Sequence, residues 1–199
     1  MSEQTIDNSK RTWIIASSCM GAVGAGFVAT PFVSSFEPSE RARAAGAAVE
    51  ADIGHLAPGE KMTVEWRGKP VWIVRRTPEQ LAALAKNDAE LADPRSQRSN
   101  FSATPPELQN DTRALKPEYL VVIGICTHLG CSPGDKFVPG PQPSLPSDWP
   151  GGFLCPCHGS TFDMSGRVFK DKPAPDNLEV PPYQYLSDTR ILVGESKKA

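Results

Sequence analysis

The sequence predicts a mainly β protein: a small domain of short strands with one inserted helix, preceded by one N-terminal transmembrane helix. Three observations support this fold class. The chain has 199 residues, of which 39% are hydrophobic and 22% charged, a balance typical of one globular domain with additional segments. Its 20 prolines and 16 glycines favour many turns and short strands over a helical bundle. Near the N-terminus, residues 12–36 contain no charged side chain.

The charge pattern excludes one class of function. The formal net charge is −2, and the sequence contains no run rich in Lys and Arg with interleaved aromatic residues. Because binding to a phosphate backbone depends on such basic patches, we expect no interaction with nucleic acid.

Residues 12–36, TWIIASSCMGAVGAGFVATPFVSSF, are long enough to cross a membrane. A helix rises about 1.5 Å per residue, so this segment extends roughly 37 Å against a hydrocarbon layer of about 30 Å. Three other interpretations compete: a cleaved signal peptide, a lipoprotein signal ending at Cys19, and a buried core helix. A core helix of this length is unusual in so small a domain, and the apolar run before Cys19 is short for a signal peptide. We therefore expect a transmembrane helix over 12–36.

The flanking residues indicate orientation and the start of the folded domain. Lys10 and Arg11 precede the apolar segment, so the positive-inside rule places residues 1–11 in the cytoplasm and the bulk of the chain outside. Residues 37–51 are rich in alanine and charge and cannot bury a face of their own. We expect them to form a tether, part helical and part flexible, before a domain over 52–199.

The next two elements have clear boundary signals. A β-hairpin is expected over 61–76, where KMTVEW and VWIVRR flank the turn RGKP. A helix is expected over TPEQLAALAKNDAELADP, because Thr77 caps it, Pro78 takes the first helical position and Gln80 completes a capping box. Pro94 is expected to end this helix.

The remaining segments predict mostly strands and loops. Residues 95–118 are polar and contain prolines, which indicates an irregular surface segment. The continuous apolar run YLVVIGIC, 119–126, indicates a buried strand that delivers Cys126 to a loop. Four further short strands are expected in the C-terminal part, at 167–169, 178–180, 183–185 and 190–193.

Cysteine and histidine gather in two short segments, CTHLGC at 126–131 and CPCHGS at 155–160. Together they hold four of the five cysteines and two of the three histidines. A single buried cysteine is usually a small hydrophobic residue of the core, but that explanation fails for six such residues in two loops. These loops are therefore the candidate metal centre, whereas His55 is expected to be a surface or strand-edge residue.

The spacing disfavours zinc as the metal. Structural zinc sites usually separate their first pair of ligands by about two to four residues, whereas CTH leaves only one. Six donors also exceed the ligand number of one tetrahedral zinc ion, so two cysteines need another role. A disulfide in an oxidising compartment outside the membrane is such a role. A zinc-stabilised, membrane-tethered binding module stays open as an alternative.

The two segments resemble, position for position, the cluster-binding loops of the Rieske iron–sulfur subunit of cytochrome bc complexes, in its bacterial form. The resemblance extends over nearly the whole chain: the anchor, the alanine-rich tether, the RTPEQL helix, the approach KPEYLVVIGICTHLGC and the loop KPAPDNL. It implies a small antiparallel β-sandwich head whose tip holds one [2Fe–2S] cluster between the two loops.

Matching positions imply that Cys126 and Cys155 ligate one iron, and that His128 and His158 ligate the other. Two neutral imidazoles in place of two thiolates remove negative charge, which makes such a cluster easier to reduce. Rieske centres lie at about −150 to +300 mV, against about −400 mV for plant-type clusters. The resemblance therefore implies a cluster that can accept an electron from a quinol.

The resemblance also implies roles for residues around the ligands. Cys131 and Cys157 would form a disulfide joining the two loops. The Ser160 hydroxyl would donate a hydrogen bond to a bridging sulfide, and Leu129 would shield the cluster from solvent. Phe162 occupies a position where many relatives carry a tyrosine that donates to a cysteine sulfur. One hydrogen bond fewer implies a lower reduction potential, because such bonds favour the reduced, more negative state.

The implied function is that of the catalytic redox subunit of a quinol–cytochrome c oxidoreductase. It would take an electron from quinol, with ubiquinol expected, and a proton through His158, with His128 in support. Cytochrome b and a membrane-bound c-type cytochrome that receives the electron are the implied partners, within a dimeric complex. A small Rieske subunit of another redox enzyme is an alternative. A Rieske oxygenase is disfavoured, because only His55 is left for a second iron site.

The location follows from the same resemblance: the bacterial inner membrane, with a single span and the head on the periplasmic side. The N-terminal stretch NSKRTWI resembles a twin-arginine export signal with Lys10 in place of the first arginine. Such a signal suits a protein that is exported folded with its cofactor.

Overall fold

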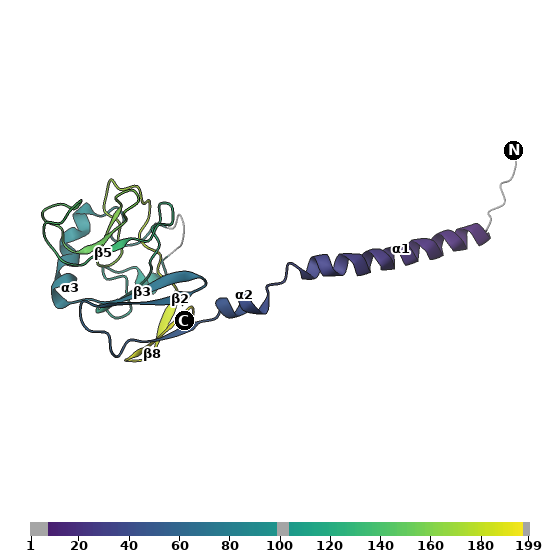
Figure 1. The fold of residues 1–199 in the computed structure, drawn as a ribbon, viewed down its shortest axis with the longest axis horizontal. Helices are drawn as coiled ribbons and strands as arrows, with labels where there is room; N and C mark the ends of the chain where they lie inside the picture. Colours follow the sequence, from purple (N-terminus) through teal and green to yellow (C-terminus); the bar gives the residue numbers. More distant parts are fainter. Residues whose placement is uncertain (1–7, 99–103, 197–199) are drawn as a thin grey trace. The chain divides into compact units, whose positions relative to one another are not determined.

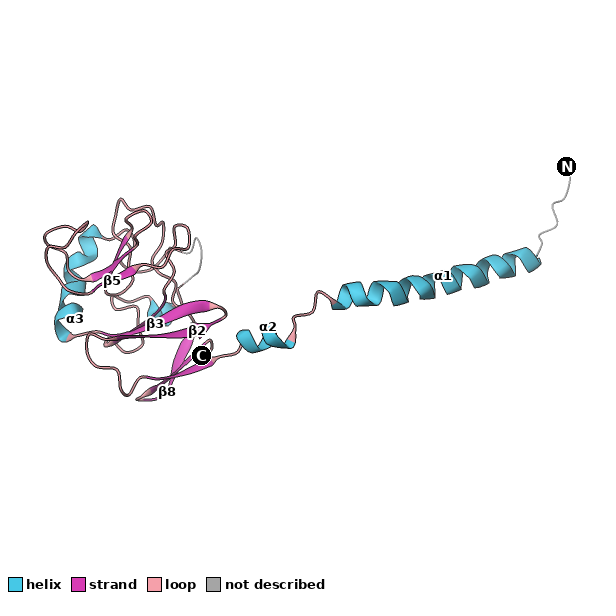
Figure 2. Ribbon diagram, viewed as in Figure 1, coloured by secondary structure: helices cyan, strands magenta, loops and turns pink. Residues whose placement is uncertain are grey.

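The computed structural model describes residues 8–98 and 104–196 (Figure 1). The chain divides between Ala44 and Ala45 into two compact units, an N-terminal helical unit and a head. All described strands belong to the head (Figure 2). Residues 1–7 of the predicted cytoplasmic segment lie outside the described residues.

Helix α1, Asn8–Ser34, covers most of the segment predicted to cross a membrane. It reaches a mean hydropathy of 1.5 over its most apolar part, none of which is buried in the protein. The helix begins before the expected first residue, Thr12, and residues 35–36 form a turn after it. An apolar helix that buries none of its residues against the described part of the chain is suited to a lipid environment.

The segment predicted as a tether is shorter than expected. Helix α2, Glu40–Ala45, is a short turn of helix, with an ion pair of 3.1 Å between Arg43 and Glu40. Strand β1, Val49–Asp52, already belongs to the head, because it pairs with the last strand of the chain and buries Ala51. The alternation of apolar and acidic residues in VEAD allows this pairing.

In its described residues, the head contains three antiparallel sheets of three strands each. Their strand orders are β1-β9-β8, β2-β3-β4 and β5-β6-β7. The antiparallel, mainly β fold class is thus confirmed, with the strands distributed over three small sheets around one core. The remaining strands are β2 (Lys61–Trp66), β3 (Lys69–Arg75), β4 (Tyr119–Ile123), β5 (Gly134–Lys136), β6 (Gly152–Leu154), β7 (Thr161–Asp163), β8 (Tyr183–Ser187) and β9 (Arg190–Val193).

The sheet of β2, β3 and β4 contacts both other sheets. Trp72 of β3 stacks on Phe153 of β6, with 5.2 Å between ring centroids. Trp66 of β2 packs so closely on Gly194, just after β9, that a Cβ there would lie 2.4 Å from the indole nitrogen. Large aromatic side chains therefore join the three sheets into one core.

The predicted β2–β3 hairpin is confirmed. Its turn residues, Arg67 and Gly68, have φ of 52° and 71°, the left-handed pair that matches the twist of two-residue hairpins. The predicted buried strand is β4, which ends at Ile123 rather than reaching Cys126. At Gly124 the backbone passes so close to Trp72 that a Cβ would lie 2.1 Å from the ring. The chain leaves the sheet here and begins the first cysteine loop.

The predicted helix after the hairpin is confirmed at its start and wrong at its end. Helix α3, Pro78–Leu84, has the expected capping box between Thr77 and Gln80. Instead of continuing to Pro94, the chain tightens into a 3₁₀ helix over Ala85–Glu90. The reason is a tertiary contact made by Arg167, which is distant in the sequence.

The buried Arg167 side chain competes for the end of α3. Its Nη2 donates to the Leu84 carbonyl oxygen and its Nη1 to Asp88 Oδ1, each over 2.8 Å. The Leu84 carbonyl is the acceptor that the Asp88 N–H would use in a continuing α-helix. A hydrogen bond from Arg167, in a distant part of the chain, thus replaces the helical hydrogen bond at the Leu84 carbonyl.

The C-terminal strands agree with the prediction in part. β8 and β9 match the expected strands at 183–185 and 190–193, whereas 167–169 and 178–180 form no strands. Near 167–169 only isolated bridges occur, and the Val168 N–H donates to Asn177 Oδ1 instead of to a neighbouring strand. The three-residue strands β5, β6 and β7 were not predicted, because they are too short to display an alternating pattern.

Candidate metal centre

Two loops of equal construction carry the cysteines and histidines. Loop 1, residues 126–131, follows β4, and loop 2, residues 155–160, follows β6 directly. In each, the N–H of the first cysteine donates over 2.8 Å to the carbonyl of the sixth residue, and the N–H of the fifth donates over 3.0 Å back to the first. The fifth residue is Gly130 or Gly159, with φ of 82° and 74°, which favours glycine.

This construction separates thiols from imidazoles. Cys126 and Cys155, the first residues of the loops, are free thiols and only 2% exposed. His128 and His158 lie nearer the surface, with 4.7 Å between ring centroids and an angle of 83° between the rings. The site therefore places two sulfur donors inside and two nitrogen donors toward solvent. Leu129 is 72% exposed beside them.

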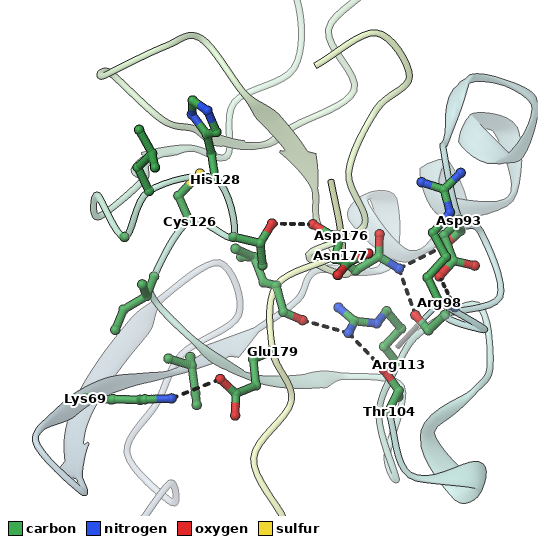
Figure 3. A pocket seen from close by; sticks show the side chains of 17 residues that line it. Lys69, Asp93, Arg98, Thr104, Arg113, Cys126, His128, Asp176, Asn177 and Glu179 are labelled. Atoms are coloured by element: carbon green, nitrogen blue, oxygen red, sulfur yellow. Dashed lines mark hydrogen bonds and ion pairs between the residues drawn. The ribbon is translucent and has the colours of Figure 1, made fainter. Parts of the chain in front are cut away.

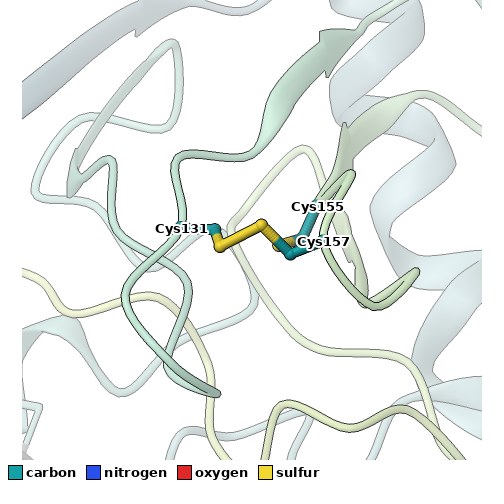
Figure 4. Close-up of side chains that lie close together, drawn as sticks. All are labelled: Cys131, Cys155 and Cys157. Atoms are coloured by element: carbon teal, nitrogen blue, oxygen red, sulfur yellow. A yellow bond between two sulfur atoms is a disulfide. The ribbon is translucent and has the colours of Figure 1, made fainter.

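The predicted pairing of the other two cysteines is present. Cys131 of loop 1 and Cys157 of loop 2 form a disulfide with 6.6 Å between Cα atoms. It joins the two loops covalently, and the Cys155 sulfur lies beside it (Figure 4). The head is then left with two free thiols, those of Cys126 and Cys155.

The environment of the thiols favours a bound cation. Burial raises the pKa of the Cys126 thiol, and hydrogen bonds from the His128 backbone and the Ser160 side chain offset this in part. Two thiolates at this depth would be costly without positive charge nearby. Bound metal ions supply such charge, which is the role that the donor set predicts.

A third segment, the proline loop of residues 173–177, supports both cysteine loops. The Ala174 N–H donates to the Oγ of Ser160, which is fully buried, over 3.0 Å. The Thr127 hydroxyl donates to the Asp176 carbonyl oxygen over 2.6 Å. Sequence reasoning predicted a role for Ser160 but missed Thr127, whose position between Cys126 and His128 was the available signal.

Hydrogen bonds of Asn177 fix the proline loop in the head. Asn177 donates from Nδ2 to the Asp93 carbonyl oxygen and to Ser96 Oγ, each over 2.9 Å, while its Oδ1 accepts from Val168. A cavity of about 260 Å³ lies between this loop and loop 1 (Figure 3). Cys126, His128 and Leu129 line it on one side, and Arg113 and Glu179 on another.

Buried ion pairs and arginines hold the turn that follows loop 2. Asp163 accepts from Arg167 over 2.8 Å, and both side chains are fully buried. Arg113 donates to the backbone carbonyl of Ser165, and Arg76 to its hydroxyl. Burial lowers the pKa of Arg76 and of Arg113 to about 10, so both keep their charge at neutral pH. Sequence reasoning missed this network, since charge alone does not reveal burial.

The other predicted residues also have definite places. Phe162 is fully buried on β7 and lies opposite Phe153 in the sheet. His55 is exposed, in agreement with the surface position expected for it. Cys19 is exposed on α1.

The donor set fits a [2Fe–2S] cluster. Once the disulfide has taken Cys131 and Cys157, two thiols and two imidazoles remain from two facing loops. Paired cysteines on one iron and paired histidines on the other are the ligation of Rieske centres. Buried sulfurs and solvent-facing imidazoles, as this head has them, are compatible with that arrangement.

Comparison with known proteins leads to the same class. Residues 47–183 match the family described as the Rieske [2Fe-2S] domain. Residues 8–39 match that described as the ubiquitinol-cytochrome C reductase Fe-S subunit TAT signal. The fold, the two loops and the family match define a Rieske [2Fe–2S] protein.

Full-length relatives specify the family further. The chain is 56% identical to the ubiquinol-cytochrome c reductase iron-sulfur subunit of Allochromatium vinosum, over 99% of this chain and 94% of that one. It is 41% identical to the subunit of Bradyrhizobium diazoefficiens, over 90% of each. A solved chain of a hyperthermophilic respiratory Complex III aligns with a TM-score of 0.47 and 25% identity, over 89% of this chain and 97% of that one. The chain belongs to the family of ubiquinol–cytochrome c reductase iron–sulfur subunits, the membrane-anchored Rieske subunits of the cytochrome bc₁ complex.

Proposed function

We propose that this subunit takes an electron and a proton from a quinol, ubiquinol in the first instance, and passes the electron to a membrane-bound c-type cytochrome. The observation that supports this most directly is the imidazole pair. The ring centroids of His128 and His158 lie 4.7 Å apart, at the solvent-facing end of a site whose thiols are buried. A substrate can therefore reach the histidines without reaching the sulfurs.

The proposed ligands are those implied by the family resemblance. Cys126 and Cys155 bind one iron through buried thiolates, and His128 and His158 bind the other. When bound, the [2Fe–2S] cluster supplies one-electron chemistry at a potential that the two neutral imidazoles raise above that of all-cysteine clusters. The disulfide Cys131–Cys157 holds the loops at a constant separation around it.

His158 is proposed as the residue that meets the quinol. A metal-bound histidine has a second ring nitrogen, which can accept a hydrogen bond from the quinol hydroxyl and take its proton. His158 is exposed whereas His128 is half-buried, so His158 takes this role and His128 supports it. Leu129, exposed beside His128, supplies an apolar cover that keeps water from the site. The Ser160 hydroxyl donates a hydrogen bond toward the cysteine sulfurs of the site.

The proposed setting is a dimeric complex of the bacterial inner membrane. Cytochrome b and a membrane-bound c-type cytochrome are the partners, residues 1–11 lie in the cytoplasm, and the head lies in the periplasm. The charges of Lys10 and Arg11 before an apolar helix support this orientation. Export by the twin-arginine route, as the match of residues 8–39 supports, would deliver the head with its cofactor in place.

Electron paramagnetic resonance of the ascorbate-reduced membrane protein, together with its iron and zinc content, tests the proposal. We expect about two irons per chain and a spectrum of low average g, typical of mixed nitrogen and sulfur ligation. Quinol turnover in the assembled complex should then disappear in a His158→Ala variant. A silent sample that contains zinc would overturn the redox function and leave a zinc-stabilised, membrane-tethered binding module.

A further inference from the structure

Three sulfur atoms of the two loops lie within reach of one another. The sulfurs of Cys131, Cys155 and Cys157 are all within 4.8 Å of each other (Figure 4). Two of them form the disulfide, and the third is a free thiol. Cys126, the other free thiol of the head, does not belong to this group of mutually close sulfurs. A thiol beside a disulfide can exchange with it.

We propose that the cluster-free head rearranges its own disulfide, and that cluster binding at Cys155 is what keeps the pairing Cys131–Cys157 in place. In the exchange, the Cys155 thiol gives up its proton to solvent and its sulfur bonds to the sulfur of Cys131. The Cys131–Cys157 bond breaks, and Cys157 leaves as a thiolate that takes up a proton. No oxidant or reductant is consumed. The protective part of this inference rests on the proposed ligand role of Cys155.

The chain favours a disulfide between Cys131 and Cys155 over the alternative exchange product, a disulfide between Cys155 and Cys157. A bond between Cys155 and Cys131 still joins loop 1 to loop 2 and closes a loop only two residues shorter than the native one. Chain entropy therefore hardly distinguishes the native pairing from the exchanged pairing. A bond between Cys155 and Cys157 would have to close across Pro156 alone, a short ring with a rigid residue in it, and would release loop 1.

The exchange has a consequence for the metal centre. An exchanged head has lost the thiol of Cys155 and carries a new thiol at Cys157, a residue that is exposed where Cys155 is buried. One of the two inner sulfur donors is then missing. Such a head cannot bind iron again until the Cys157 thiol attacks the new disulfide and reverses the step. Loss of the cluster would therefore be followed by loss of the site that receives it.

The test uses the full-length chain, purified in detergent with its cluster, in a Cys19→Ser background that removes the remaining free thiol outside the head. Iron is removed with a chelator, without oxygen and without added thiols. Free thiols are trapped with N-ethylmaleimide at intervals, and tandem mass spectrometry locates the maleimide on Cys155 or Cys157. Circular dichroism follows the fold of the same samples.

In loaded protein we expect the disulfide Cys131–Cys157 alone. After iron removal, maleimide should move from Cys155 to Cys157 as the disulfide Cys131–Cys155 appears, at a rate unchanged by tenfold dilution. The fraction that can be reloaded with iron should fall in the same proportion. A Cys126→Ser variant should still exchange, whereas Cys155→Ser should keep the native pairing.

Three results would overturn the proposal: cluster-free protein that keeps maleimide on Cys126 and Cys155 only, a Cys155–Cys157 disulfide, or disulfides that include Cys126. The last marks pairing that includes a sulfur outside this group of three. A failure of the proposed function can be told apart from these results, because the protein as purified would then contain zinc or lack iron. The exchange is read from the position of the maleimide.

Discussion

Ser160 of loop 2 and Ala174 of the proline loop are joined by a hydrogen bond in which the Ala174 N–H donates to Ser160 Oγ over 3.0 Å. Because this bond uses the oxygen as an acceptor, the hydroxyl hydrogen is directed elsewhere, and the Cys126 sulfur is a neighbour that it reaches. A backbone group thereby orients the Ser160 donor toward the sulfur side of the metal centre.

Replacing Ser160 by Ala should lower the reduction potential of the cluster. A hydrogen bond to a charged group is worth roughly 1.5–3 kcal/mol, and we expect about half of this to distinguish the two redox states. Half of this range is about 0.75–1.5 kcal/mol. Since about 1.4 kcal/mol is a tenfold shift, which corresponds to about 59 mV for one electron, a fall of about 30–65 mV is expected. Redox titration followed by electron paramagnetic resonance measures it. Ser165→Ala is the matched control, because that serine is equally buried but accepts from Arg76.

Replacing Phe162 by Tyr should raise the potential by a similar amount. The resemblance places a tyrosine hydroxyl at this position in many relatives, and its hydrogen bond to a cysteine sulfur would favour the reduced cluster. The same titration checks this, with Phe137→Tyr, on a half-buried ring of the same core, as the control. A potential that stays the same or falls would count against the expected role of this position.

Replacing Gly124 by Ala should destabilise the head and displace Cys126. The added Cβ would lie 2.1 Å from the Trp72 ring, so the backbone that begins loop 1 must move. Overpacking of this kind costs about 1–3 kcal/mol, and loss of part of the bound iron should accompany it. Chemical denaturation and iron analysis measure the two effects. Gly134→Ala, where the nearest atom is 3.7 Å away, should change neither.

Stiffening the tether should slow turnover and leave the cluster unaffected. If the head must move between a quinol site and a c-type cytochrome, prolines at Gly46 and Ala47 restrict the backbone between α2 and β1. We expect several-fold lower turnover in the assembled complex and an unchanged electron paramagnetic resonance spectrum. Gly46→Ala with Ala47→Ser is the flexible control. Turnover equal to that of the unmodified protein would show that the head needs no movement of this kind.

Much of the fold was predictable because its signals are local. The β2–β3 hairpin has its turn sequence, α3 has a capping box at Thr77, and α1 carries no charged residue from Thr12 onward. Elements without a local signal were missed or misjudged. The end of α3 depends on Arg167, which is distant in the sequence, and the strands around loop 2 are too short to show a period.

The chemistry of the metal centre could be predicted from residue types and their spacing: two loops rich in cysteine and histidine, four expected donors of the Rieske type, and an apolar helix before them. Donor type and spacing are properties of neighbouring residues, so they can be read without the fold. The folded head was needed to see the depth of Cys126 and Cys155, the support of Ser160 by Ala174, and the proximity of Cys155 to the disulfide. These depend on contacts between segments far apart in the chain, and packing of the whole head is what brings such segments together.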